Sequence, residues 1–240
     1  MEVRTEALVL RTVKYGESRV IVDMLTAERG RVSFICNISK NGRGKVRKQL
    51  FQPMTFLDVV FDYRANVQLQ RFRDLSINRP YVSIPFDSGK LSIMMFLAEF
   101  LTYATRDEQD NRPLFEYIEK SLLWLDSAQQ AFANFHLVFM MHLTRFVGFY
   151  PNLDDWGDGA WFDLREGCFT RLRPLHQDCL NPIEASRVNT LMRMDYDNMR
   201  LFRMSRADRN RCAEVILYYY RLHIPNFPEM RSLDVLRTLF

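Results

Sequence analysis

The sequence predicts an α+β protein in which a small β-barrel precedes an α-helical domain. Residues 1–77 contain short runs rich in Val, Ile, Phe and Thr that alternate in polarity, which is typical of half-buried strands. From residue 85 onwards, apolar side chains recur at three- and four-residue spacing, which is typical of helices. With 48% hydrophobic and 26% charged residues, the composition is that of an ordinary globular protein.

We place the first domain at residues 1–80 and expect five strands in it. These cover Ala7–Lys14, Arg19–Leu25, Gly30–Ile38, Met54–Tyr63 and Val67–Ile77. Turn residues such as Gly16 and Gly42 separate them. Because closing a sheet removes its exposed edges, five short strands in this length favour a small barrel. The oligonucleotide-binding (OB) fold suits this pattern, and an SH3-like barrel is the alternative.

The second domain, residues 86–240, follows a linker that Pro80 and Pro85 bracket. Its expected helices span Lys90–Thr105, Pro113–Ser127, Gln130–Gly148, Pro182–Met194, Arg206–His223 and Ser232–Leu239. Ser205 is suited to cap the fifth of these helices, with Asp208 three residues further on. An irregular insert at about residues 151–180 interrupts the helical pattern, and we expect a hairpin within it from Trp161 to Leu172.

The sequence has no feature of export or membrane insertion. Its start, MEVRTE, is charged and no apolar core follows, so no secretory signal is expected. Polar or charged side chains interrupt the longest apolar stretches, residues 91–103 and 132–150, so neither is expected to span a bilayer. Four scattered cysteines do not make a disulfide framework. We therefore expect a cytoplasmic protein.

Positive charge is concentrated in the N-terminal third of the chain. Residues 1–75 hold 14 Lys or Arg against 8 Asp or Glu, whereas the remainder holds 19 against 21. Residues 29–49 alone carry seven positive side chains and no carboxylate. Such asymmetry indicates a polyanionic partner, and a solvated basic face is the alternative. We favour the functional patch because the run is uncompensated.

We expect the nucleic-acid contacts to come from this basic region and from its neighbouring strands. The predicted set is Arg11, Lys14, Arg19, Arg29, Arg31, Lys40, Arg43, Lys45, Arg47, Lys48, Arg71 and Arg73. Tyr15, Phe34 and Phe72 are candidates to stack on bases. For Phe34 a core position is favoured, because it alternates with Val32 and Cys36. A second group of arginines, residues 200–211, interleaves with aspartates, which favours a salt-bridged solvent face.

No catalytic constellation is apparent in the sequence. The segment Gly42–Val46 resembles the end of a phosphate-binding loop, but it lacks the earlier glycine and the Ser or Thr that binds magnesium. A nuclease would need a metal-binding acidic cluster, which we do not find, so we expect no enzyme. Cys168, His176 and Cys179 lie close together in sequence and are candidate zinc ligands. Because neither cysteine belongs to a C-x2-C pair, thiols without a metal are favoured.

The chain resembles the bacterial recombination mediator family RecO over nearly its full length. The matching segments are ALVLRTVKYGESRVIVDMLTAERGRVSFI, LFQPMTFLDVVF, FMMHLTRFVGFYPNLD and LYYYRLHIPNFPEMRSLDVLRTLF. Each motif alone is loose, but their order and spacing together are fairly specific. The resemblance implies an N-terminal OB domain, binding of single- and double-stranded DNA, annealing of complementary strands, and help in loading RecA onto strands coated by single-strand-binding protein.

The resemblance also implies partners and a location, and the chain differs from the family in one feature. Family members act with RecR, and with RecF in one branch. An apolar pocket with a basic rim would bind the acidic, Phe-ending tail of single-strand-binding protein, and the protein would associate with the nucleoid. Many members carry a zinc knuckle after the Pro-x-Leu element, whereas Asn152–Trp161 has no cysteine here. We therefore expect no cofactor. An RNA-binding OB protein linked to translation is the alternative function.

Overall fold

A computed structural model describes residues 1–38 and 48–239, with Lys48 and Leu239 described by their backbone alone. The chain divides into two compact units, residues 1–126 and residues 127–240. The sequence pattern changes from strand to helix near residue 85, but the division in space falls later. Helices α1 (Ser88–Ala104) and α2 (Arg112–Ser127) therefore belong with the strands of the first unit.

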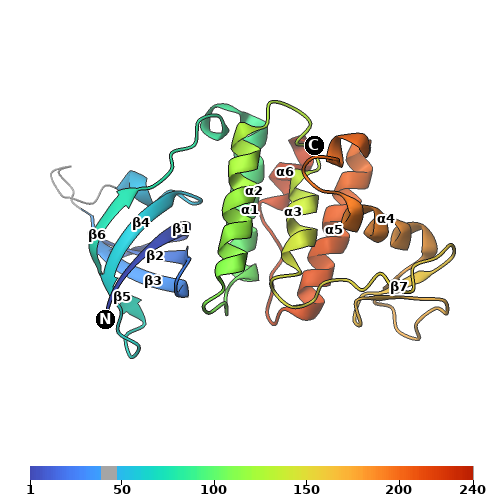
Figure 1. Ribbon diagram of the computed structural model, residues 1–240, viewed down its shortest axis with the longest axis horizontal. Coiled ribbons are helices and arrows are strands. Elements are labelled where there is room, and N and C mark those ends of the chain that lie inside the picture. Colours follow the sequence, from blue (N-terminus) through green and yellow to red (C-terminus); the bar gives the residue numbers. More distant parts are fainter. Residues whose placement is uncertain (39–47, 240) are drawn as a thin grey trace. The chain divides into compact units, whose positions relative to one another are not determined.

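In its described residues, 1–38 and 48–126, the first unit is built on one curved sheet of six strands in the order β5-β3-β2-β1-β4-β6 (Figure 1). The strands are β1 (Glu2–Tyr15), β2 (Arg19–Thr26), β3 (Gly30–Asn37), β4 (Phe56–Asp62), β5 (Leu69–Gln70) and β6 (Phe72–Ile77). This strand-rich region followed by helices confirms the α+β class. The expected fifth strand is divided at Arg71, where β5 pairs with β3 and β6 pairs with β4. One continuous segment, residues 69–77, therefore pairs with both β3 and β4, which lie on opposite sides of the β2–β1 pair.

In the middle of strand β1, residues 7–10 are buried on both faces of the sheet. Ala7 and Val9 belong to the apolar cluster inside the sheet, which also contains Phe34. Leu8 and Leu10, which alternate with them, are also buried, and α1 contacts β1. The side chains of this run, ALVL, therefore belong to two apolar layers.

Two close contacts attach α1 and α2 to the strands. Gly30 has a φ of +56°, and a Cβ atom there would lie 1.9 Å from the carbonyl oxygen of Gln109 in the α1–α2 loop. At the end of α2, the Asp126 carboxylate accepts backbone N–H groups from residues 82–84 at 2.8–2.9 Å. The linker after β6 is thereby fixed to α2.

Among its described residues, the second unit contains four α-helices and a small sheet. The helices are α3 (Phe135–Leu143), α4 (Pro182–Arg193), α5 (Arg206–His223) and α6 (Leu233–Leu239). The Ser205 side chain caps α5, as expected, by accepting the Asp208 N–H. Helix α3 begins later than predicted, because Ala131 has a φ of +63° that no α-helix contains, and it ends at Leu143 instead of Gly148.

The insert forms a three-stranded sheet in the order β8-β7-β9. Strands β7 (Trp161–Asp163) and β8 (Cys168–Thr170) make the expected hairpin, and β9 (Cys179–Leu180) adds a strand that the sequence did not predict. Short 3-10 helices occur at Lys48–Phe51 (η1), Ile84–Phe86 (η2) and Met199–Leu201 (η3). Within residues 1–38 and 48–239, no helix has both the length and the apolar character needed to cross a bilayer.

Candidate nucleic-acid interface

The outward face of β1, β2 and β3 carries three cross-strand rows of side chains. The strand register aligns Arg11 with Asp23 and Ser33, Val13 with Ile21 and Ile35, and Tyr15 with Arg19 and Asn37. The residues between them on β2 and β3, such as Val20 and Phe34, point into the apolar cluster. This outward face therefore changes along the strands from a polar row, through an apolar row, to a row at the β1–β2 hairpin.

The apolar row and the hairpin row are accessible to solvent. Val13 is 47% exposed and Tyr15 is 46% exposed, and Ile21 and Ile35 are partly exposed beside them. The Arg19 guanidinium lies over the Tyr15 ring, 5.1 Å from its centroid. An aromatic ring and a cation at one end of an apolar row are the groups on which unpaired bases stack.

The polar row is an ion cluster centred on the buried Asp23. Its carboxylate accepts hydrogen bonds from Arg11 at 2.6 Å, Arg31 at 3.2 Å and Ser33 at 2.5 Å. Burial alone would raise the pKa of Asp23, but the hydrogen bonds from Ser33 and Arg11 and the charge of Arg31 hold that pKa below its ordinary value. Arg31 also donates to the carbonyl oxygen of Thr102 in α1. Asp23 therefore stays ionised near neutral pH and fixes both arginines.

The basic segment between β3 and η1 falls largely outside the described residues. Lys40, Arg43, Lys45 and Arg47 are not described, and neither is the side chain of Lys48. The flanking residues are placed, however. The Ile38 N–H donates to the Ser18 carbonyl at 2.8 Å, and the Thr12 hydroxyl donates to the Phe51 carbonyl at 2.7 Å. The described residues that flank the segment are therefore hydrogen-bonded to the β1–β2 turn and to β1.

The other residues that we predicted to contact nucleic acid differ in their surroundings. Lys14 and Arg71 are exposed, and no ion pair to either is found among the described residues. Arg29 lies over the Tyr63 ring at 5.0 Å. Arg73 pairs with Glu2 at 2.7 Å, on the opposite side of the sheet order from β3. The arginines at 31 and 73 thus have intramolecular partners, whereas Lys14, Arg19 and Arg71 present their charge to solvent.

Sequence reasoning missed the apolar row and the Asp23 cluster. The alternation of Arg11, Val13 and Tyr15 indicates one strand face, but pairing this face with β2 and β3 requires the register. A single carboxylate inside the apolar run RVIVDML was the available signal for a buried ion pair, because an unpaired charge in that position would be costly.

In the described residues of the second unit, neither the candidate zinc ligands nor the arginines of residues 200–211 form a binding site. Cys168 and Cys179 lie on strands that flank β7, and His176 contacts Asp163 at 3.0 Å. Among the described residues, no three side chains of His, Cys, Asp or Glu are placed to hold a metal ion. In the arginine group, Arg211 pairs with Glu184 at 2.6 Å, and Arg206 donates to a backbone carbonyl.

Two family models match this chain in succession. "Recombination protein O N terminal" matches residues 1–81, and "Recombination protein O C terminal" matches residues 85–233. Together with the strand-rich N-terminal region, these matches define an α+β protein with an N-terminal OB-fold domain. The chain belongs to the RecO family.

Similar proteins cover the whole chain. The chain is 47% identical to the "DNA repair protein RecO" of Phocaeicola vulgatus over 237 residues, which is 99% of this chain and 98% of the relative. The identity is also 47% to the protein of that name from Bacteroides fragilis, with the same coverage. It is 32% to that from Christiangramia forsetii, with both chains fully covered. The resemblance inferred from the motifs is thereby confirmed.

Proposed function

We propose that this chain is a recombination mediator in DNA repair that binds DNA through the outward face of β1, β2 and β3. Membership of the RecO family and the similarity to proteins named as DNA repair proteins support the role. The observation that carries the proposed site is the partly exposed row of Val13, Ile21 and Ile35, which ends at the Arg19–Tyr15 pair. The proposed activity includes annealing of complementary strands and help in loading RecA onto coated single strands.

The proposed mechanism contains no chemical step. Two complementary strands repel each other through their phosphates, and bound cations lower this repulsion while condensed counterions are released. Lys14, Arg19 and Arg71 supply exposed charge on the described surface. Tyr15 offers its ring to one base, and the apolar row accepts the neighbouring bases. A strand bound in this way has its pairing edges available to a second strand.

The basic segment after β3 extends this surface in the proposal. Its five cations at positions 40, 43, 45, 47 and 48 would neutralise phosphates next to the hairpin, because the described residues that flank the segment are hydrogen-bonded to the β1–β2 turn and to β1. Phosphate contacts of this kind are insensitive to base sequence, which suits a protein that anneals any complementary pair.

Charge reversal tests this surface. Exchanging Lys45, Arg47 and Lys48 for Glu should weaken binding of single-stranded DNA and lower the slope of log affinity against log salt by about 2. The matched control reverses Arg171, Arg193 and Arg200, which are exposed in the second unit. Equal losses in both triple variants would show a general charge effect and refute the site. Competition between DNA and RNA of one sequence tests the alternative RNA-binding role.

The proposed partners are RecR, single-strand-binding protein, RecF and RecA. For the acidic, Phe-ending tail of single-strand-binding protein, we propose the cavity of about 430 Å³ between β9 and α5. Leu164, Leu180 and Val215 supply apolar side chains to its lining. Its charged lining residues are Arg211, Arg221, Glu184 and Glu214. Binding of a labelled tail peptide should weaken in Arg221→Glu, whereas Arg193→Glu on α4 should have no effect. Unchanged binding in Arg221→Glu would exclude this cavity.

A further inference from the structure

The small sheet of the insert has two faces of opposite character. Its register places Phe169, Phe162 and Leu180 in one cross-strand row. In the next row, which points the other way, Asp163 on the central strand β7 stands between Cys168 on β8 and Cys179 on β9. A buried carboxylate thus lies at the position between the only two cysteines of the insert.

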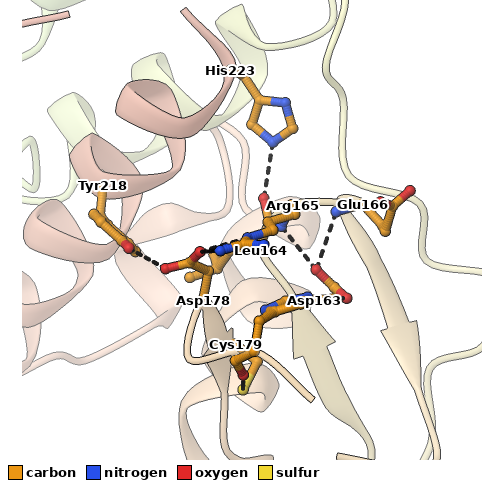
Figure 2. A network of polar contacts seen from close by, with 9 residues as sticks. Asp163, Leu164, Arg165, Glu166, Asp178, Cys179, Tyr218 and His223 are labelled. Atoms are coloured by element: carbon orange, nitrogen blue, oxygen red, sulfur yellow. Dashed lines mark hydrogen bonds and ion pairs between the residues drawn. The ribbon is translucent and has the colours of Figure 1, made fainter. Parts of the chain in front are cut away.

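Both oxygens of the Asp163 carboxylate have hydrogen-bond partners within the insert. One of its oxygens, Oδ1, accepts the backbone N–H groups of Arg165 at 2.8 Å and Glu166 at 3.1 Å, as Figure 2 shows. The other, Oδ2, lies 3.0 Å from Nε2 of His176, in the connection between β8 and β9. One side chain therefore joins the β7–β8 turn to the segment that leads into β9.

A second set of contacts attaches this sheet to α5. Asp178 accepts hydrogen bonds from Arg165 at 2.6 Å and from the hydroxyl of Tyr218 (Figure 2). His223 Nε2 lies 2.9 Å from the carbonyl oxygen of Leu164. In the β7–β8 turn, a Cβ atom on Gly167 would lie 2.5 Å from the Tyr219 hydroxyl, so this turn packs directly against α5.

The positions of the two cysteines do not fit one zinc ion. Each pairs with Asp163 across a different edge of β7, so two strand spacings of about 4.8 Å separate their backbones by about 10 Å. Two sulfur atoms on one zinc lie within about 4.6 Å of each other, because each Zn–S bond is about 2.3 Å long. Both thiols therefore cannot reach one metal unless Asp163 is displaced.

The remaining donors do not complete a site either. His176 has a buried Nδ1 atom with no hydrogen-bond partner in the described residues, but a single imidazole nitrogen does not make a four-coordinate centre.

We propose that the insert folds without zinc, and that the Asp163 carboxylate takes over the joining role of a metal. Asp163 connects the β7–β8 turn to His176, and the Asp178 contacts hold the resulting sheet on α5. The inference concerns how this unit is held together and does not depend on the proposed DNA-binding function.

Metal analysis and hydrogen exchange of the full-length chain test the proposal. We expect well under one zinc per chain, and an unfolding temperature that neither chelator nor added zinc changes. The double variant Cys168→Ser, Cys179→Ser should have the same zinc content and the same response of its unfolding temperature to chelator and zinc as the unmodified chain. Asp163→Ala should lower the unfolding temperature by roughly 3–8 °C and raise exchange in residues 161–180 about tenfold or more, because charged hydrogen bonds and satisfied backbone groups are lost.

Each component can overturn the inference. One zinc per chain that disappears in the double cysteine variant, with a fall in unfolding temperature on chelation, would show that a metal holds the insert. Unchanged hydrogen exchange of residues 161–180 in Asp163→Ala would show that the carboxylate does not hold the insert together. If Asp163→Ala does not fold, His176→Gln replaces it, and increased exchange confined to the insert is then the expected result.

Discussion

Gly30 and Gln109 approach so closely that no side chain fits between them. Gly30, at the start of β3, has a left-handed φ of +56°, and a Cβ atom there would lie 1.9 Å from the Gln109 carbonyl oxygen. The next residue, Arg31, donates its backbone N–H to the Glu108 carbonyl at 3.1 Å. The strand that borders the candidate interface is thereby fixed to the α1–α2 loop.

Gly30→Ala should therefore lower the free energy of unfolding by about 3 kcal/mol or more. The left-handed conformation costs about 1–2 kcal/mol for alanine, and the clash with backbone adds to it. Urea unfolding measures the loss. The control is Gly16→Ala, which shares the left-handed φ, at +71°, but meets open space, so only the conformational cost of about 1–2 kcal/mol is expected. Equal losses would show that the approach to Gln109 is unimportant.

Asp23→Asn should lower the free energy of unfolding by about 2–4 kcal/mol at pH 7. Arg31, whose side chain is only 12% exposed, would lose its counter-charge. Since the folded-state pKa of Asp23 lies below its ordinary value near 3.8, the stabilisation is present above about pH 4 and is lost as pH falls through the folded pKa.

Denaturant titrations at pH 7 and pH 3 check both parts of that expectation. The difference between wild type and Asp23→Asn should shrink at pH 3. Asp62→Asn is the control, because Asp62 is 46% exposed and its pair with Arg73 should contribute less than about 1 kcal/mol. A gap between wild type and Asp23→Asn that does not change with pH would contradict the assigned ion cluster.

Tyr15→Ala should weaken binding of single-stranded DNA by about 5- to 100-fold, the effect of losing one base-stacking ring. Binding of duplex DNA, whose bases are already stacked, should change much less. Fluorescence anisotropy with labelled oligonucleotides measures both. Tyr150→Ala is a matched control, because Tyr150 is 40% exposed and also has an arginine, Arg145, over its ring at 5.0 Å. Similar losses in the two variants would refute the stacking role.

His136 should make the protein less stable in mild acid. Burial, together with the charge of Arg209, lowers the pKa of His136 from 6.5 to about 3. The unfolded chain therefore binds a proton between these values that the folded chain does not, so stability falls as pH decreases from 6.5 towards 3.

This one group should account for up to about 1.4 kcal/mol per pH unit in that range. Unfolding measured at several pH values should show that the free energy of unfolding depends less steeply on pH in His136→Gln. Part of the dependence should remain, because burial also lowers the pKa of His142. An unchanged slope would show that His136 does not titrate in this way.

Local sequence patterns predicted most elements but not their partners. Alternation located the strands and apolar spacing located most helices, because each depends on near neighbours. The two pairings of residues 69–77 and the position of α1 and α2 beside the strands depend on contacts between distant residues, which no local pattern records. Charge predicted a basic surface, but it did not distinguish Arg31, which Asp23 binds, from Arg19, which lies over Tyr15.

The pairing of residues 69–77 with both β3 and β4 has a consequence for synthesis on the ribosome. While the first 62 residues emerge, the outer strands β3 and β4 are already made but lack the segment that pairs with them. Unpaired strand edges are sites at which chains associate incorrectly. We therefore expect fragments that end before β5 to aggregate, and chains that continue through residue 126 to fold.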